Sequence, residues 1–112
     1  MPLACTGVNH RTASVALRER LALGPVAQQR VLHESRQDAR APFTELAILS
    51  TCNRTEVYAE LSPQGGAALA AWLAAERSGD DPEVKDRFYI HEGDAALQHL
   101  FRVACGDRKS VV

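Results

Sequence analysis

The chain has 112 residues, 46% of them hydrophobic and 24% charged, which suits one globular domain with its own core. Its formal net charge of −1 is no general signal for nucleic acid, so tRNA could bind only through a local patch or through regions outside these residues. No apolar run approaches the roughly 18 residues that span a bilayer, and the N-terminus lacks the features of a signal peptide, so we expect no membrane association.

The first part of the chain predicts a strand followed by two helices. Residues 3–8 form the strand, and Thr12 or Ser14 can cap the helix that follows. Gly24 and Pro25 interrupt that helix, and Pro25 is well placed to begin a second one that runs to about Gln37. The apolar residues on which these two helices are expected to pack are Val15, Leu17, Leu21, Leu23, Val26, Val31 and Leu32.

A hairpin and a further helix are predicted next. Residues 43–49 and 55–61 read as strands joined by a short turn, and residues 62–66 form a loop. Residues 67–77 are rich in Ala and Leu and predict a helix.

The last part predicts a short strand at residues 87–91 and a final helix. Asp94 is expected to cap this helix, which runs to Ala104 with Gly106 at its C-terminal end. Its expected buried stripe is Leu97, Leu100, Phe101 and Ala104. The element order predicts an α+β fold: a ferredoxin-like split β-α-β sandwich with a four-stranded antiparallel sheet, helices on one face and an extra C-terminal helix.

The hairpin turn holds the residues with the clearest chemistry. Cys52 follows an apolar run and precedes Arg54 by two residues. A cysteine at a strand end is exposed, and a nearby guanidinium stabilises the thiolate, which is the nucleophilic form. The pattern therefore predicts a catalytic cysteine, the alternative being an inert small residue inside the turn.

The other two cysteines, Cys5 and Cys105, are expected to be packing residues. The three cysteines are widely spaced and include no Cys-x-x-Cys pair. This spacing favours reduced thiols in a cytoplasmic protein, with neither a zinc site nor a disulfide framework.

Three segments together resemble one family. Residues 50–58 read Ser-Thr-Cys-Asn-Arg-Thr-Glu-x-Tyr, residues 7–13 read Gly-Val-Asn-His-Arg-Thr-Ala, and residues 99–106 read His-Leu-Phe-Arg-Val-Ala-Cys-Gly. In this order and spacing they resemble the N-terminal catalytic domain of glutamyl-tRNA reductase, the first committed enzyme of the five-carbon route to tetrapyrroles and 5-aminolevulinate.

The resemblance implies a reaction and a set of roles. In the family, a cysteine attacks the glutamyl ester of tRNA(Glu), and NADPH reduces the resulting thioester to glutamate-1-semialdehyde. Cys52 matches the nucleophile, and His99 matches the active-site histidine, as a substrate-orienting group or proton donor. The residues expected to contact substrate are Thr51, Asn53, Arg54, Asn9 and His10. Of these, Arg54 matches a residue that holds the substrate's carboxylate, whereas Thr51 and Asn53 either bond the carbonyl oxygen or shape the turn.

The resemblance ends near residue 106, so we expect a catalytic domain at residues 1–106 and a divergent tail at 107–112. From Gly106 onward the family reads Gly-Leu-Asp-Ser, whereas here Lys109 occupies the serine's place unless the register slips to Ser110. No Gly-x-Gly-x-x-Gly motif occurs, so NADPH is not expected to bind these residues, and the cysteine spacing predicts no metal site. We expect no counterpart in these residues of the family's NADPH domain or of its dimerisation helix, through which it forms homodimers. Its further partner is glutamate-1-semialdehyde aminotransferase.

Two other functions stay open at this stage. A non-catalytic binding module would keep the fold without the chemistry, which the altered tail favours. A cysteine-dependent esterase would release the acyl group to water, because a thioester without a hydride donor has no other fate than attack by a nucleophile.

Overall fold

The computed structural model describes residues 3–38, 41–61, 65–78, 84 and 86–105. The strands within these residues are β1 (Leu3–Asn9), β2 (Phe43–Ser50), β3 (Arg54–Leu61) and β4 (Tyr89–Glu92). The helices are α1 (Val15–Leu21), α2 (Pro25–Gln37), α3 (Gly65–Ser78) and α5 (Asp94–Ala104). Each predicted strand and helix is therefore present, with ends that differ by one or two residues; Gly106 and the tail lie outside the described residues.

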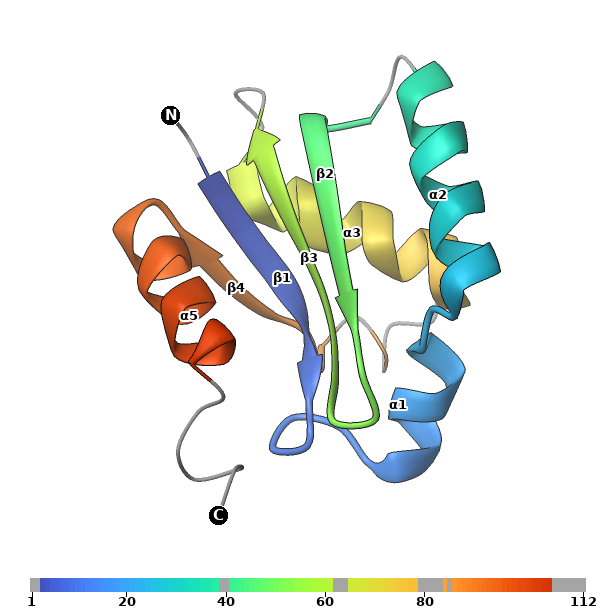
Figure 1. Ribbon diagram of the computed structural model, residues 1–112, viewed down its shortest axis with the longest axis vertical. Helices are drawn as coiled ribbons and strands as arrows, with labels where there is room; N and C mark the ends of the chain where they lie inside the picture. Colours follow the sequence, from blue (N-terminus) through green and yellow to red (C-terminus); the bar gives the residue numbers. More distant parts are fainter. Residues whose placement is uncertain (1–2, 39–40, 62–64, 79–83, 85, 106–112) are drawn as a thin grey trace.

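The four strands form one antiparallel sheet in the order β2-β3-β1-β4 (Figure 1). Strand β1 lies between β3 and β4, and β2 pairs with β3 as a hairpin. This order places the first strand beside the third and the fourth, as the split β-α-β arrangement requires. The predicted α+β fold and its extra C-terminal helix are confirmed.

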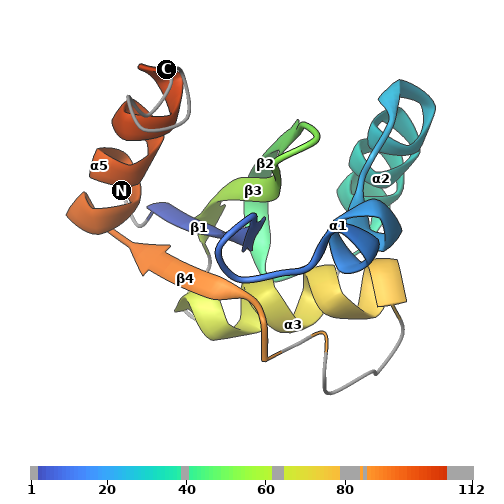
Figure 2. The same cartoon turned by 90° about the horizontal axis from the view of Figure 1, so that it is seen from below.

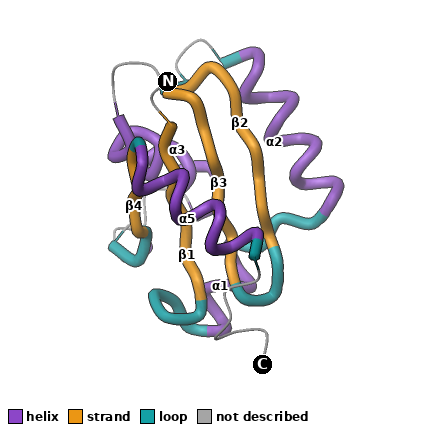
Figure 3. The backbone as a smooth tube through the Cα atoms, turned by 60° about the vertical axis from the view of Figure 1, so that its left-hand side comes forward, coloured by secondary structure: helices purple, strands orange, loops and turns teal. Residues whose placement is uncertain are grey.

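Helices cover both faces of the sheet, because the extra C-terminal helix, which the element order did not place, lies on the face opposite α3. Helix α3 lies under one face, and α5 crosses the other in front of β1 and β3 (Figures 2 and 3). Leu69 and Leu73 of α3 pack against Ala4, Val57 and Ala59. On the opposite face, Ala96 of helix α5 packs with Cys5 and Tyr58. The partly buried residues around this cluster are Leu3, Tyr89 and Leu100.

The two central strands are buried on both sides because helices cover both faces. Successive residues of a strand point to opposite faces, so Val57 meets α3 while Glu56 and Tyr58 face α5. Gly7 lies opposite Glu56 in the pairing of β1 with β3. A Cβ at Gly7 would stand 2.2 Å from the carbonyl oxygen of Thr55, so only glycine lets the two strands approach here.

Helix α5 is rotated relative to the predicted stripe. Its inward residues are Ala96, His99, Leu100 and Val103, at helical spacing, whereas Leu97, Phe101 and Ala104 are exposed. Ala96, with no exposed surface, allows close approach to the sheet, and the same rotation carries His99 inward. The N-cap is Gly93 at φ 59°, not Asp94, which is the first residue of the helix.

The N-terminal helices follow the prediction in part. Ser14 caps α1 by accepting a hydrogen bond from the backbone N–H of Leu17. Leu21, Leu23 and Val31 are buried as expected, but Val15 and Val26 are exposed. None of the helices in the described part of the chain has the length and apolar character that crossing a bilayer requires.

Candidate active site

Cys52 lies at the tip of the β2-β3 hairpin and is exposed, as are its neighbours Thr51 and Asn53. The turn is closed by a hydrogen bond of 2.7 Å from the N–H of Thr51 to the carbonyl oxygen of Arg54. The hydroxyl of Thr51 also accepts a hydrogen bond of 3.2 Å from the N–H of Asn53. Thr51 therefore shapes the turn, and the thiol is presented to solvent on a hydrogen-bonded hairpin.

The base of the hairpin is tied to the rest of the domain through Ser50. Its hydroxyl lies 3.0 Å from the hydroxyl of Thr55 and accepts a hydrogen bond of 2.9 Å from the N–H of Leu23. These contacts join both strands of the hairpin to the segment after α1. A short, anchored turn of this kind holds a side chain more precisely than a free loop.

Arg54 is turned inward, unlike the three residues before it. It begins β3, opposite Asn9 of β1, and its side chain is only 10% exposed. Its Nη1 atom lies 3.6 Å from Oε2 of Glu56. The turn after β1 and the cysteine hairpin thus lie at the same end of the sheet (Figure 1).

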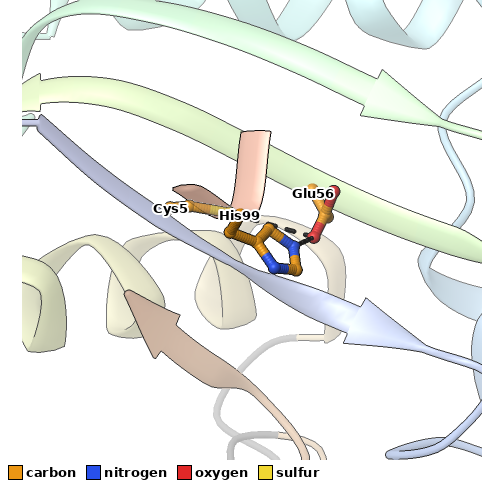
Figure 4. Close-up of side chains that lie close together, drawn as sticks. All are labelled: Cys5, Glu56 and His99. Carbon is orange, nitrogen blue, oxygen red and sulfur yellow. Dashed lines mark hydrogen bonds and ion pairs between the residues drawn. The ribbon is translucent and has the colours of Figure 1, made fainter. Parts of the chain in front are cut away.

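Glu56 is the centre of a buried cluster and has no exposed surface. Its Oε1 atom accepts a hydrogen bond of 3.1 Å from the Tyr58 hydroxyl. Its Oε2 atom is in hydrogen-bond contact with the Tyr89 hydroxyl and with Nε2 of His99. The thiol of Cys5 points to the same oxygen from 3.9 Å (Figure 4). Four elements, β1, β3, β4 and α5, therefore meet at one carboxylate.

The hydrogen bonds to Glu56 set its charge. Burial by itself would raise the pKa of this carboxyl group, but hydrogen bonds from Tyr89 and His99 and the nearby positive charges outweigh it, so the net shift of the Glu56 pKa is downward. Burial and the adjacent Glu56 raise the pKa values of the Cys5 thiol and of the Tyr89 hydroxyl. The carboxylate is therefore ionised, and the Cys5 thiol and the Tyr89 hydroxyl stay protonated as donors.

His99 is in ring contact with a second histidine. Its ring stacks on that of His91 with centroids 4.4 Å apart, and the ring of Tyr89 lies 5.5 Å from His99. Burial, then the adjacent His99, lower the pKa of His91. His99 thus sits between an acceptor, Glu56, and two aromatic rings that limit its orientation.

The described chain also resembles known proteins in sequence and structure. The model of the family "Glutamyl-tRNAGlu reductase, N-terminal domain" matches residues 6–112. Glutamyl-tRNA reductases of Pseudoalteromonas translucida and Photobacterium profundum are 42% and 41% identical over 106 residues, 95% of this chain and 25% of each relative. A solved glutamyl-tRNA reductase from Methanopyrus kandleri aligns with a TM-score of 0.64 and 26% identity, over 95% of this chain and 23% of that one.

The chain belongs to the glutamyl-tRNA reductase N-terminal domain family. The resemblance inferred from the three sequence segments is confirmed. The chain spans about a quarter of the length of the curated relatives it matches.

The predicted site residues of this reductase domain fall into two groups. Arg54 and His99 meet at Glu56, whereas Cys52 and its two neighbours stand exposed at the hairpin tip. Asn9 pairs with Arg54 in the sheet, but its side-chain oxygen accepts hydrogen bonds from the N–H groups of Arg11 and Thr12, and His10 is exposed.

Sequence reasoning missed the cluster around Glu56, although part of its signal was present. Arg54, Glu56 and Tyr58 alternate along β3, and alternation puts them on one face of the sheet. A polar face of this kind is normally assigned to solvent. Helix α5 covers it here, so the same alternation signals a buried polar cluster that also includes Tyr89 and His91.

The cluster could be taken for a metal centre. Cys5, Glu56 and His99 offer a thiol, a carboxylate and an imidazole whose ligand atoms lie within 4.8 Å of one another. However, His99 and Glu56 are in direct hydrogen-bond contact, whereas two ligands of one zinc ion are held about 3 Å apart by bonds of about 2 Å. The geometry fits a hydrogen-bonded cluster better than a metal site.

Cys105 is exposed as the C-cap residue of α5, so the expectation that it packs in the interior is wrong, whereas Cys5 is fully buried.

Brief iodoacetamide treatment of the folded domain should label Cys52 first and Cys105, the other exposed cysteine of the described residues, more slowly. Cys5 should stay unlabelled until the chain is denatured. Peptide mass spectrometry after timed quenching measures the order. Faster labelling of Cys105 than of Cys52 would argue against activation of Cys52 by its surroundings.

Proposed function

We propose that this chain is the catalytic domain of a glutamyl-tRNA reductase and that Cys52 is its nucleophile. The thiolate attacks the carbonyl carbon of the glutamyl ester, the bond to the ribose oxygen of tRNA breaks, and that oxygen leaves as a hydroxyl after taking a proton. The product on the protein is a glutamyl thioester. The observation that carries this proposal is the placement of Cys52 on an exposed, anchored turn two residues before the inward-facing Arg54.

The neighbouring residues have roles that suit this chemistry. Arg54 presents a planar guanidinium, which matches the side-chain carboxylate of a glutamyl group. His99 orients the substrate or supplies the proton for the leaving oxygen. The side chain of Asn53 is exposed beside Cys52 and is free to bond the carbonyl oxygen of the ester, a role that Thr51 can share. Asn9 and His10 form the adjoining turn from which contact with the substrate is proposed.

Family membership implies NADPH as the reductant that converts the thioester to glutamate-1-semialdehyde. The described residues do not fit that cofactor. Their sheet is antiparallel, whereas dinucleotides bind at the switch point of parallel sheets, and no glycine-rich phosphate loop is found in the sequence. The chemistry proposed for residues 1–106 therefore ends at the thioester. Beyond it, we propose tRNA(Glu) and the aminotransferase as partners, homodimerisation as in the family, and a cytoplasmic location.

The test is transfer of the glutamyl group from tRNA to the protein. The domain is incubated with glutamyl-tRNA that carries radiolabelled glutamate, and the reaction is stopped in acid. The label is expected on the tryptic peptide that contains Cys52, in a bond that hydroxylamine cleaves. Release of free glutamate without a trapped thioester would support the esterase alternative, whereas neither labelled protein nor released glutamate would support a binding module.

A further inference from the structure

The two oxygens of Glu56 have different neighbours. Oε1 accepts only the hydroxyl of Tyr58 among the described residues, at 3.1 Å. Oε2 faces the hydroxyl of Tyr89, Nε2 of His99, the thiol of Cys5 and the guanidinium of Arg54. A change in the hydrogen bonds at Oε2 therefore acts on Arg54 and His99, the two neighbours of Glu56 that are proposed to contact the substrate. A change at Oε1 does not reach these two residues directly.

Arg54 faces Glu56 as an ion pair and not as a hydrogen bond. Its Nη1 atom stands 3.6 Å from Oε2, within range of an ion pair but beyond the 2.7–3.2 Å of an N–H···O bond. Two nearer donors, from Tyr89 and His99, already occupy that oxygen. Because a carboxylate oxygen has two lone pairs, the guanidinium is aligned by Glu56 while its N–H groups are not consumed by it.

The hydroxyl of Tyr89 is suited to act as a permanent hydrogen-bond donor to Glu56. It lies on the edge strand β4 opposite Gly7, and its carbonyl oxygen accepts a hydrogen bond of 2.8 Å from the Thr6 hydroxyl. Burial and the charge of Glu56 raise its pKa, so the hydroxyl donates at every physiological pH. The donor capacity of His99, by contrast, depends on its tautomer and charge.

We propose that Tyr89 is a positioning residue: by occupying Oε2 of Glu56, its hydroxyl keeps Arg54 aligned yet available to bind the side-chain carboxylate of the substrate. This inference rests on the proposed function. The ionisable groups around Glu56 on which it depends are Cys5 of β1, Arg54 and Tyr58 of β3, Tyr89 and His91 of β4, and His99 of α5.

The test compares Tyr89→Phe with Tyr58→Phe, which removes a hydroxyl from the other oxygen of the same carboxylate. Each variant is assayed for thioester formation with glutamyl-tRNA and with glutaminyl-tRNA, whose side chain is a neutral amide. In Tyr89→Phe, Glu56 is free to bond Arg54 directly. The preference for the glutamyl substrate, measured as the ratio of the second-order rate constants for thioester formation, should therefore fall by roughly tenfold or more. Tyr58→Phe should retain the preference. An equal loss for both substrates, or the same loss of preference in Tyr58→Phe, would overturn the proposal.

A crystal structure of Tyr89→Phe gives a second result that does not depend on activity. The separation between Nη1 of Arg54 and Oε2 of Glu56 should shorten from 3.6 Å into hydrogen-bond range. An unchanged separation would overturn the positioning role, even if Cys52 forms the thioester. If the native domain forms no thioester while this separation does shorten, the proposed function fails and the structural effect of Tyr89 stands.

Discussion

Cys52→Ser should abolish thioester formation on glutamyl-tRNA while leaving the domain folded. Loss of an enzymatic nucleophile reduces turnover by on the order of 10⁴-fold or more, because a serine hydroxyl without an activating base is a far weaker nucleophile than a thiolate. Cys52 is exposed at the hairpin tip, so the change should alter the free energy of unfolding by no more than about 0.5 kcal/mol. Acid-quenched trapping of radiolabelled glutamate measures the first effect, and urea denaturation measures the second.

Cys105→Ser is the matched control, since Cys105 is the other exposed cysteine of the described chain. It should form the thioester at the native rate. If Cys52→Ser still accumulates a hydroxylamine-sensitive adduct, covalent catalysis by Cys52 is wrong. If Cys105→Ser loses the adduct instead, the nucleophile has been assigned to the wrong thiol.

Glu56→Gln should cost about 3 kcal/mol of stability at neutral pH. The substitution keeps the volume of the side chain but removes the charge that Arg54 and the hydrogen-bond donors face in a site without exposed surface. Breaking a buried ion pair by neutralising one partner typically costs about 3–5 kcal/mol, because the other charge stays buried without compensation. The expected value lies at the lower end because the amide oxygen can still accept from Tyr58 or Tyr89.

The pH dependence of this loss has a definite sign. The pKa of Glu56 is lower in the folded chain than its ordinary value near 4.3. The ionised group therefore contributes its stability above the unfolded-state pKa, and that contribution disappears as the pH falls through the lower folded-state pKa. Urea denaturation at pH 7 and at progressively lower pH should show the difference between native and Glu56→Gln domains shrinking in acid.

Glu45→Gln serves as the control for this series, because Glu45 lies exposed on the edge strand β2. Its unfolding free energy should stay within about 0.5 kcal/mol of the native value. A difference between native and Glu56→Gln domains that does not vary with pH would show that Glu56 is not ionised in the folded domain.

The sequence predicted the elements well because their signals are local. Ser14 caps α1 and Pro25 begins α2, as the chemistry of helix starts leads one to expect. The short polar segment at residues 51–53 separates two strands and forms the hairpin turn. The position of Cys52 at an exposed turn follows from the same reasoning, and the three family segments identified the domain.

The orientation of α5 could not be predicted in the same way. Leu97 and Phe101 are the larger apolar residues, and hydrophobicity alone turns them inward. The observed helix instead buries Ala96 and brings His99 to Glu56, because the small alanine allows close contact and the carboxylate requires donors in a buried site. The orientation of α5 therefore depends on the residues of the sheet that the helix faces. The periodicity of the helix sequence carries no information about those residues.

Sequence by itself determined the order of strands and helices, the exposed cysteine turn and the family, since each depends on residues close together in the chain or on matched segments. Only the tertiary structure decided that Glu56 is the centre of a buried cluster that includes Arg54 and His99. Its partners Cys5, Tyr89 and His99 are 51, 33 and 43 residues away. The physical reason is that a buried carboxylate is stable only where donors from several elements converge, and that convergence exists only when the sheet and α5 have packed.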